Sequence, residues 1–289
     1  MQLAVNIVVL ASIYALIACG YVLVYRVSRV LNLAHGELMV LGAYGLFATA
    51  SLFSGHPLVA IAVAALLALA VGTFVYRILM RRMTGEAVLA AVLATIALGI
   101  LLRGVMVLVW GAQERHPLQT LGFSNASVAI GPARISSVNL TLVAVTAITY
   151  LALHLFLRYT AWGVRMRAAG QNPLLAAQRG IPLHAIYALT WGLSTFTGGL
   201  AGMLIASESA LDQSMVVIGL KAFPAALVGG LDSLGGALLG ALIVAAADVL
   251  AIYYVDPLLA DVAPFFVLLA MLAVRPWGLF GAREELDRV

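Results

Sequence analysis

The chain has 289 residues, of which 64% are hydrophobic and 10% are charged, and its mean hydropathy is +1.08. Soluble domains are roughly 45–50% apolar and about 25% charged. Because too few polar side chains are present to cover a water-exposed surface, the surroundings of most of the chain must be lipid. This composition excludes a soluble enzyme, a nucleic-acid-binding domain and a disordered linker.

The few charges support this conclusion. The net charge is +4, and Lys221 is the only lysine among the 16 basic residues. The arginines stand in small groups between long apolar runs, which suits loops beside anionic lipid and argues against nucleic acid as a partner. Cys19 is the single cysteine, so an internal disulfide and a cysteine zinc cluster are both excluded.

Long apolar runs predict an all-α integral membrane protein, because a spanning helix needs about 20 mostly apolar residues. In chain order we expect about nine crossings, at roughly 3–25, 36–54, 57–77, 87–110, 138–157, 184–206, 216–231, 235–254 and 262–275. Two of these, 216–231 and 262–275, are short, so eight or ten crossings remain possible. No basic residue precedes Arg26, which favours an uncleaved first span over a signal peptide.

The basic residues also predict the orientation, because cytoplasmic loops are enriched in Lys and Arg. If the N-terminus is outside, twelve of the 16 basic residues fall on the inner side: Arg26, Arg29, Arg77, Arg81, Arg82, Arg158, Arg165, Arg167, Arg179, Arg275, Arg283 and Arg288. Arg115 and Arg134 fall on the outer side, whereas Arg103 and Lys221 lie within crossings. We therefore expect the N-terminus outside and the C-terminus in the cytoplasm.

The sequence lacks the patterns that nucleotide or metal chemistry needs. A P-loop requires Gly-Lys-Ser/Thr, whereas Lys221 is followed by Ala222 in an apolar segment, so we expect no ATPase site. The five histidines show no i,i+4 pairing and no neighbouring ligand cluster, so we expect neither a metal nor another cofactor. The chain is therefore not expected to be an enzyme.

An inner loop at about 158–183 contains a short predicted helix, Pro173–Arg179. Asn172 is a favourable N-cap, proline suits the first helical position, and Gly180 suits the residue after the helix. Arg179 in the last turn complements the helix dipole. Such a helix would offer a partner's groove the side chains of Leu174, Leu175, Ala176 and Ala177. The alternative is an ordinary loop whose arginines contact lipid phosphates.

Charges inside a span are costly and therefore mark candidate functional residues. His35 and Glu37 begin the second span, where we expect a polar site near the cytoplasmic mouth; a helix cap neutralised by nearby arginines is the alternative. Arg103 and Asp248 lie about 10 Å and about 9 Å below the outer ends of their helices at 1.5 Å per residue. We hypothesise that Asp248 neutralises Arg103 or Lys221, with snorkelling to the outer interface as the alternative.

Two glycine pairs predict close packing between helices. Gly198 and Gly202, and likewise Gly236 and Gly240, are four residues apart. In a helix this spacing places both glycines of a pair on one face, where a neighbouring backbone can approach.

Three segments carry a resemblance to a known family. They are Asn32-Leu-Ala-His-Gly-Glu-Leu-Met-Val-Leu-Gly-Ala-Tyr44, then Gly163–Pro173 with Ala176-Ala177 and Gly180-Ile181, and finally Leu227–Gly240. Over nearly its whole length the chain resembles the H-type permease subunit of bacterial branched-chain amino-acid ABC importers. It departs from many relatives at Gly170-Gln171, where they carry acidic residues in the coupling loop.

The resemblance implies a single transmembrane permease domain, 1–289, in the bacterial inner membrane, where membrane lipid surrounds it. It further implies import of branched-chain or related small amino acids, a second homologous permease subunit of the M type, two cytoplasmic ATPase subunits and a periplasmic substrate-binding protein. Relatives also carry urea or short amides. The coupling loop would include Arg165, Arg167, Asn172, Pro173, Ala176, Ala177, Arg179 and Gly180. Candidates for the substrate path are Asn32, His35, Gly36, Glu37, Arg103 and Asp248.

Two other classes of function remain open. A self-sufficient secondary transporter or channel would need a coupling acid that faces a cavity, for which Glu37 and Asp248 are the obvious residues. A membrane scaffold that transports nothing would use the inner loop for docking alone.

Overall fold

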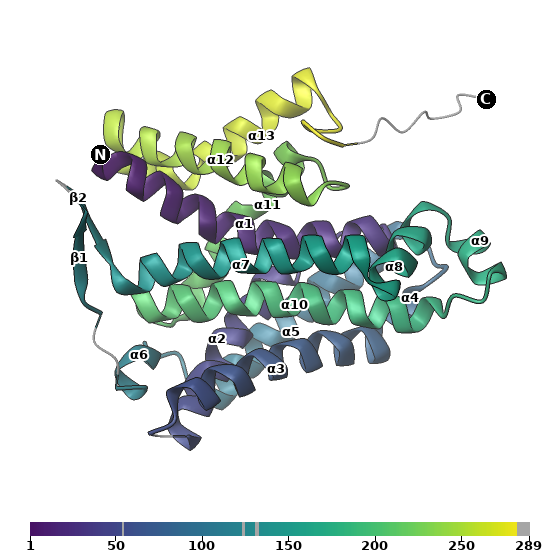
Figure 1. Ribbon diagram of the computed structural model, residues 1–289, viewed down its shortest axis with the longest axis horizontal. Coiled ribbons are helices and arrows are strands. Elements are labelled where there is room, and N and C mark those ends of the chain that lie inside the picture. Colours follow the sequence, from purple (N-terminus) through teal and green to yellow (C-terminus); the bar gives the residue numbers. More distant parts are fainter. Residues whose placement is uncertain (54, 123–124, 131–132, 282–289) are drawn as a thin grey trace.

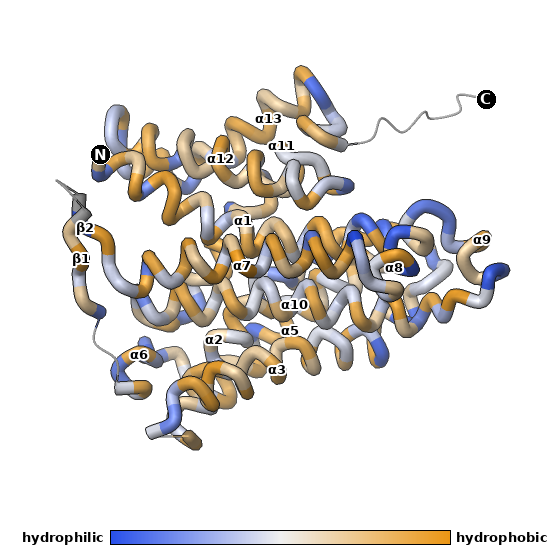
Figure 2. Tube along the Cα trace, viewed as in Figure 1, coloured by the Kyte–Doolittle hydropathy of each residue, from blue (hydrophilic) through white to orange (hydrophobic). Residues whose placement is uncertain are grey.

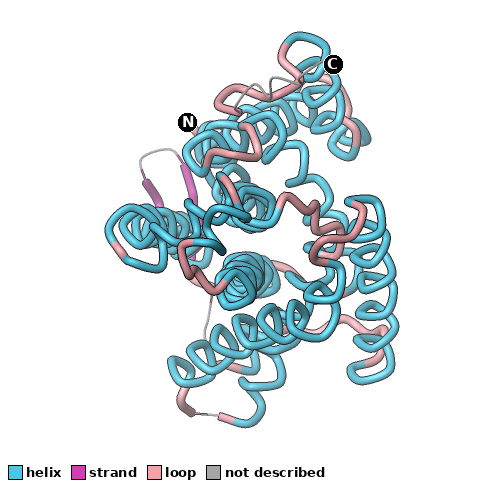
Figure 3. Tube along the Cα trace, turned by 90° about the vertical axis from the view of Figure 1, so that its right-hand side faces the viewer, coloured by secondary structure: helices cyan, strands magenta, loops and turns pink. Residues whose placement is uncertain are grey.

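The computed structural model describes residues 1–53, 55–122, 125–130 and 133–281. Arg283 and Arg288, which were counted for the orientation, lie outside these residues. The described chain is a bundle of helices, in which α1, α7 and α10 run side by side along the long axis (Figure 1). Viewed from the end that carries α8 and α9, several helices are seen nearly end-on (Figure 3). The predicted helical architecture is therefore confirmed.

Within the part of the chain that the structure describes, six helices are long and apolar enough to cross a membrane. They are α1 (Gln2–Ser28), α3 (Pro57–Val75), α5 (Val88–Trp110), α7 (Ser137–Tyr159), α10 (Leu183–Glu208) and α12 (Leu234–Tyr254), and α3 continues through η1 (Tyr76–Met80) and α4 (Arg81–Met83). Shorter helices are α2 (His35–Leu52), α11 (Val216–Gly229) and α13 (Ala263–Val274). All nine predicted segments are thus helical, with ends within a turn of the expected residues.

Hydropathy separates the shafts of the helices from the ends of the bundle. In Figure 2 apolar residues follow the long helices, whereas polar residues gather at the two ends, especially around α8 (Ala161–Gln171) and α9 (Pro173–Gln178). Large apolar side chains on the shafts are exposed, such as Leu66 on α3, Ile100 on α5 and Ile148 on α7. Lipid is the solvent that such surfaces need.

A small β-hairpin departs from the all-α prediction. The strands β1 (Ser127–Ile130) and β2 (Ala133–Ser136) pair antiparallel, with Val128 opposite Ile135. They lie with α6 (Pro117–Thr120) at the end of the bundle where the chain starts (Figure 1). The Gln2 side chain joins the hairpin, because it accepts a hydrogen bond from Arg134 N (2.9 Å) and donates one to Arg134 O (3.1 Å). The N-terminus is therefore attached to the loop before α7.

Helices α1 and α10 form the centre of the bundle. In each of them 72% of the most apolar window is buried, compared with 28% in α3, 22% in α5 and 28% in α7. Glycines let the neighbours of α10 come close: a Cβ atom added to Gly42 of α2 would lie 2.5 Å from Gly199 Cα. Residues on the facing sides of α1, α2 and α10 are consequently out of reach of lipid.

Two connections turn back into the bundle. The segment 29–34 leads from the end of α1 to α2, and the segment 209–215, which includes η2 (Gln213–Met215), leads from the end of α10 to α11. The first residues of the two helices meet, since a Cβ atom on Gly36 would lie 3.1 Å from Val216 O. Because α1 and α10 run in opposite directions, the two re-entrant segments enter from opposite ends, an arrangement of the kind seen in inverted repeats of transporters. The last helix, α13, follows η3 (Pro257–Asp261).

Candidate functional site

The chain turns back into the bundle directly after α1. Arg29 ends that helix in the left-handed conformation (φ 55°). Asn32 follows, is 1% exposed, and its Oδ1 accepts a hydrogen bond from Ala34 N at 3.2 Å. An asparagine that bonds the backbone two residues ahead forms an Asx turn. This local turn is what starts α2 at His35.

A hydroxyl group from α5 holds the same turn. Thr95 is fully buried, its Oγ1 accepts a hydrogen bond from Leu33 N at 3.1 Å, and it lies 3.4 Å from Leu31 O. Non-helical backbone inside a membrane protein needs such partners, because water is not available to it. The re-entrant segment is therefore tied to α5 as well as to α1.

His35 occupies a slot between two helices. Its ring is fully buried, and Nε2 lies 3.1 Å from the backbone oxygen of Ile17 on α1. Because a carbonyl oxygen only accepts, Nε2 must carry the proton. The ring centroid lies 4.6 Å from that of Tyr21. A Cβ atom on Gly20 would overlap the imidazole, and one on Gly198 would lie 2.9 Å from its Cε1, so both glycines are needed to make room for the ring.

His35 lies midway along the bundle. Ile17 is 11 residues before Ser28 and 15 residues after Gln2, which corresponds to about 16 Å and about 22 Å along α1. The expectation that His35 and Glu37 sit near the cytoplasmic mouth is therefore wrong, because the segment 29–34 carries the start of α2 into the interior. Their position at the start of a helix is as predicted, with Glu37 in the first turn.

Glu37 forms an ion pair with Arg103 of α5. The distance from Glu37 Oε1 to Arg103 Nη2 is 3.0 Å, and the two side chains are 10% and 52% exposed. Gly99, one turn before the arginine, allows this approach, since a Cβ atom there would lie 3.2 Å from the Glu37 carboxyl carbon. The carboxylate is thus held between a guanidinium and the positive end of α2.

The expected pairing of Asp248 with Arg103 is wrong, because Arg103 pairs with Glu37; the charge of Lys221 acts on Asp248, but the ion pair of Lys221 is with another carboxylate. Asp248 accepts a hydrogen bond of 2.7 Å from the Tyr14 hydroxyl, and Lys221 Nζ lies 2.6 Å from Asp261. Equal distance from a helix end gives residues a similar depth, but it does not determine which helices they face. The second carboxylate oxygen of Asp248 is buried and has no hydrogen-bond partner among the described residues.

The start of α2 also contacts the start of α11. A Cβ atom on Gly219 would lie 2.6 Å from Gly36 Cα, so the two backbones touch. Tyr21 of α1 links both helices, because its hydroxyl donates to Gly219 O at 3.3 Å and its ring packs against His35 and, at 5.3 Å, Phe223. The polar start of α2 therefore lies where three helices meet inside the bundle.

Both predicted glycine pairs lie at close contacts between helices. Gly198 and Gly202 of α10 face α2, whereas Gly236 and Gly240 of α12 face α11. A Cβ atom on Gly202 would overlap Met39 O, and one on Gly240 would overlap Ala225 O. The shorter helices α2 and α11 are thus each packed backbone to backbone against a longer helix.

The inner loop contains a helix, α8, that the sequence analysis missed. Its first turn is capped by the Thr160 hydroxyl, which accepts a backbone hydrogen bond. Its end packs on the end of α1, since a Cβ atom on Gly170 would overlap Arg26 O. On its outward face the Arg165 guanidinium lies 5.6 Å from the Trp162 ring centroid. The inner loop is therefore attached to the bundle through the contact between α8 and α1.

The predicted short helix is present as α9. Its N-cap is Asn172, whose Oδ1 accepts from Leu175 N at 2.9 Å, and Gly180 follows it with φ 78°. Leu174 and Leu175 are 71% and 50% exposed. Ala176, expected to face a partner, is instead 4% exposed, because it packs back on the protein. The apolar surface that α9 presents thus includes the two leucines and Ala177, which is exposed as expected.

The comparison with known proteins agrees with these features. A family model described as "branched-chain amino acid transport system / permease component" matches residues 3–273. This chain belongs to that family. It is 30% identical over 304 residues to the high-affinity branched-chain amino acid transport system permease protein LivH of Escherichia coli (strain K12), covering 100% of this chain and 97% of that protein.

Two further members of the family align over most of their length. The permease protein BraD of Pseudomonas aeruginosa is 28% identical over 302 residues, covering 100% of this chain and 98% of BraD. A probable LivH permease of Methanocaldococcus jannaschii is 26% identical over 290 residues, covering 95% and 90%. The family and the six apolar helices make this chain a multi-pass membrane permease component.

Several residues around the start of α2 were not found from the sequence. Gly20, Tyr21, Thr95 and Gly99 surround the start of α2, but each stands alone in an apolar run and signals nothing locally. The nearest signal in the sequence for this site is the set of hydroxyl-bearing residues of α10. One of them, Ser194, donates a hydrogen bond to Gly20 O at 2.9 Å. No group of three His, Cys, Asp or Glu residues is placed to hold a metal within the described ranges.

Proposed function

We propose that this permease is the membrane subunit of an ABC importer that moves branched-chain or related small amino acids into the cytoplasm and is powered by separate ATPase subunits. The observation that carries the proposal is the start of α2 at mid-depth, beside Ile17 of α1. Transporter sites near the bilayer midplane are typically formed by such discontinuous helices, whose N-termini favour anionic groups. A substrate carboxylate is an anion of this kind.

The polar groups near the start of α2 support an amino-acid path. Asn32 Nδ2 and His35 Nδ1 are buried and lack a hydrogen-bond partner in the described part of the chain. Together with Gly36 and Glu37 they form the inner part of the proposed path. We include Arg103 of α5, which pairs with Glu37, and Asp248 of α12, one of whose buried carboxylate oxygens has no hydrogen-bond partner among the described residues. A zwitterion needs few charged partners, which fits so sparse a set.

The proposed contact with the ATPases is the α8–α9 region. The exposed leucines of α9, together with Arg165, Arg167 and Arg179, offer an apolar knob with a basic rim. Its rigid attachment to α1 through Gly170 supports transmission of motion into the central helix. We propose two such ATPases, a second homologous permease and a periplasmic binding protein as partners, by analogy with the relatives named as components of transport systems.

The proposed topology has about nine crossings by one domain, 1–289, in the bacterial inner membrane. The six long helices are joined in this proposal by α2, which has 18 residues, and by α11 and α13, which are individually shorter than a bilayer requires. In the proposed orientation the N-terminus is outside and the C-terminus is in the cytoplasm, which the positive-inside rule supports because twelve basic residues then fall on the inner side.

Uptake in cells that lack this gene tests the proposal. Restoring the gene should restore uptake of labelled leucine, isoleucine or valine, with unlabelled branched-chain amino acids competing and urea or acetamide leaving uptake unchanged. Competition by urea or acetamide, without competition by leucine, would assign the permease to the amide carriers. Unchanged leucine uptake on deletion of the genes for the proposed partner ATPases would contradict the ABC mechanism.

A further inference from the structure

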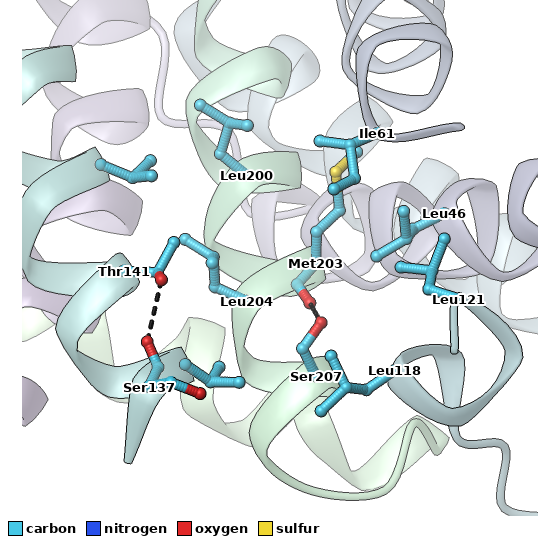
Figure 4. Close-up of a pocket in the computed structure, with 12 residues that line it drawn as sticks. Leu46, Ile61, Leu118, Leu121, Ser137, Thr141, Leu200, Met203, Leu204 and Ser207 are labelled. Atoms are coloured by element: carbon cyan, nitrogen blue, oxygen red, sulfur yellow. Dashed lines mark hydrogen bonds between the residues drawn. The ribbon is translucent and has the colours of Figure 1, made fainter. Parts of the chain in front are cut away.

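A groove on the side of the bundle lies outside the proposed path. It runs between α3 and α7 over α10 and has a volume of about 330 Å³ (Figure 4). Its walls are largely apolar, with contributions from Leu46, Ile61, Val145, Leu200, Met203 and Leu204. None of these side chains belongs to the cluster around His35, so the groove needs a separate explanation.

The groove continues into a polar pocket at the end of the bundle. This pocket has a volume of about 400 Å³ and is lined by His116, Gln119, Asn125, Glu208 and Ser209, among others. The two spaces adjoin, because Leu118 and Ser207 line both. An apolar groove joined end to end with a polar pocket matches a molecule that has an apolar tail and a polar head.

The length of the groove fits one leaflet of a bilayer. On α7 its lining residues run from Ser137 to Val145, a length of about 12 Å at the rise of an α-helix. The hydrocarbon of one leaflet is about 15 Å thick, half of the whole core. The polar pocket then lies at the level of the lipid headgroups.

The volume of the groove is sufficient for an acyl chain. A cavity of about 150 Å³ already holds benzene, so a hydrocarbon chain fits. The flanking helices α3 and α7 are only 28% buried in their apolar windows, which leaves the groove open to the bilayer.

The polar pocket offers groups for a zwitterionic headgroup. The Glu208 carboxylate accepts hydrogen bonds from Asn125 Nδ2 (2.9 Å), Ser136 Oγ (2.7 Å) and Asn139 Nδ2 (3.1 Å). Since a carboxylate has about four acceptor sites, it retains capacity for an ammonium group. The side chains of His116 and Gln119 supply N–H donors suited to a phosphate.

We propose that the groove and the pocket together bind one phospholipid with an amine-bearing headgroup, of the phosphatidylethanolamine type. An acyl chain lies along α10 between α3 and α7, and the headgroup ammonium meets Glu208. Under the orientation proposed above the lipid belongs to the outer leaflet; the lipid site does not otherwise depend on the transport function.

Photo-crosslinking in bilayers tests this site. The assembled transporter is placed in nanodiscs of phosphatidylethanolamine or phosphatidylglycerol that carry a diazirine on one acyl chain, and mass spectrometry locates the adducts. With phosphatidylethanolamine we expect adducts on 137–145 and 200–207. Thr141→Trp, on the rim of the groove, should lower them about tenfold. Leu151→Trp, at a 60% exposed position farther along α7, is the matched control and should leave them unchanged. Val145→Phe replaces Thr141→Trp if that variant does not assemble.

The headgroup is tested separately. Glu208→Gln keeps an acceptor oxygen but removes the charge, so it should abolish the preference for phosphatidylethanolamine while the groove is still labelled. Equal labelling of the wild type and the groove variant would overturn the proposal. Adducts joining the groove to another polypeptide would assign it to a protein partner, and competition by leucine would assign it to the substrate; either result also overturns the proposal.

Discussion

The Nε2 atom of His35 lies 3.1 Å from the backbone oxygen of Ile17, at the middle of the central helix α1. This hydrogen bond ties the first residue of α2, a helix that begins inside the bundle, to the helix around which the bundle is built. Two glycines, Gly20 and Gly198, leave the space that the imidazole fills. The depth at which α2 starts is thus set by a side chain fitted between two backbones.

Gly20→Ala should displace His35 and lower stability. A Cβ atom at this position would overlap the imidazole, and overpacking of a buried site costs about 1–3 kcal/mol. The matched control is Gly45→Ala on α2, where an added Cβ atom meets nothing within 4 Å. Thermal unfolding in detergent and leucine uptake measure the effect. Equal stability and uptake for the two variants would show that the slot around His35 has no structural role.

Arg103→Gln should be more harmful than Glu37→Gln. The first change leaves a carboxylate whose side chain is 10% exposed without its partner, whereas the second leaves an arginine that is 52% exposed and can reach polar surroundings. Because the arginine is half exposed, we expect a loss of about 1–2 kcal/mol for Arg103→Gln rather than the larger value of a fully buried pair.

The double variant isolates this ion pair. Removing both charges leaves no unpaired carboxylate, so the double variant should be more stable than Arg103→Gln alone. Unfolding midpoints of the four proteins form a double-mutant cycle. Strictly additive losses would mean that the two side chains do not interact in the membrane.

Leu174→Asp should uncouple the permease from its ATPases without unfolding it. The side chain is 71% exposed on α9, so the change alters the proposed docking surface and little else. Leu258→Asp makes the same substitution at an 83% exposed site at the opposite end of the bundle. Copurification of the ATPase subunits should fall about tenfold for Leu174→Asp and remain normal for Leu258→Asp. Equal retention by both variants would remove α9 from the interface.

Neighbouring glycines of α12 provide a fourth prediction. A Cβ atom on Gly236 would overlap Gly229 O, whereas one on Gly235 meets nothing within 4 Å. Gly236→Ala should therefore force α11 and α12 apart and lower the unfolding temperature, while Gly235→Ala should be neutral or slightly stabilising. A reversed order would mean that the two helices pack through a different face.

Sequence patterns located the helices but not their depth. Apolar runs marked all nine segments, because a segment that lipid or core surrounds must be apolar along its length. They did not reveal that 29–34 turns inward, since Leu31, Leu33 and Ala34 look the same beside a bilayer surface as inside a bundle. The depth of His35 was therefore misjudged.

Pairing between distant residues was also beyond the sequence. Glu37 and Arg103 are 66 residues apart, and their contact depends on how α2 and α5 cross.

Local sequence signals were more informative. Asn172 and Gly180 predicted the ends of α9, because capping involves only residues within one turn. The helix α8 was missed because Gly163 and Gly170, which lower helix propensity, are there for contacts with α7 and α1.

Reconstitution into proteoliposomes tests the central claim most directly. The permease is combined with its second permease subunit, the two ATPases and the binding protein, and uptake of labelled leucine is followed with and without ATP. We predict uptake that requires ATP and every subunit, with none when this chain alone is given a proton gradient. Gradient-driven uptake by the chain alone, unaffected by ATP or the ATPases, would contradict its assignment as the membrane subunit of an ABC importer.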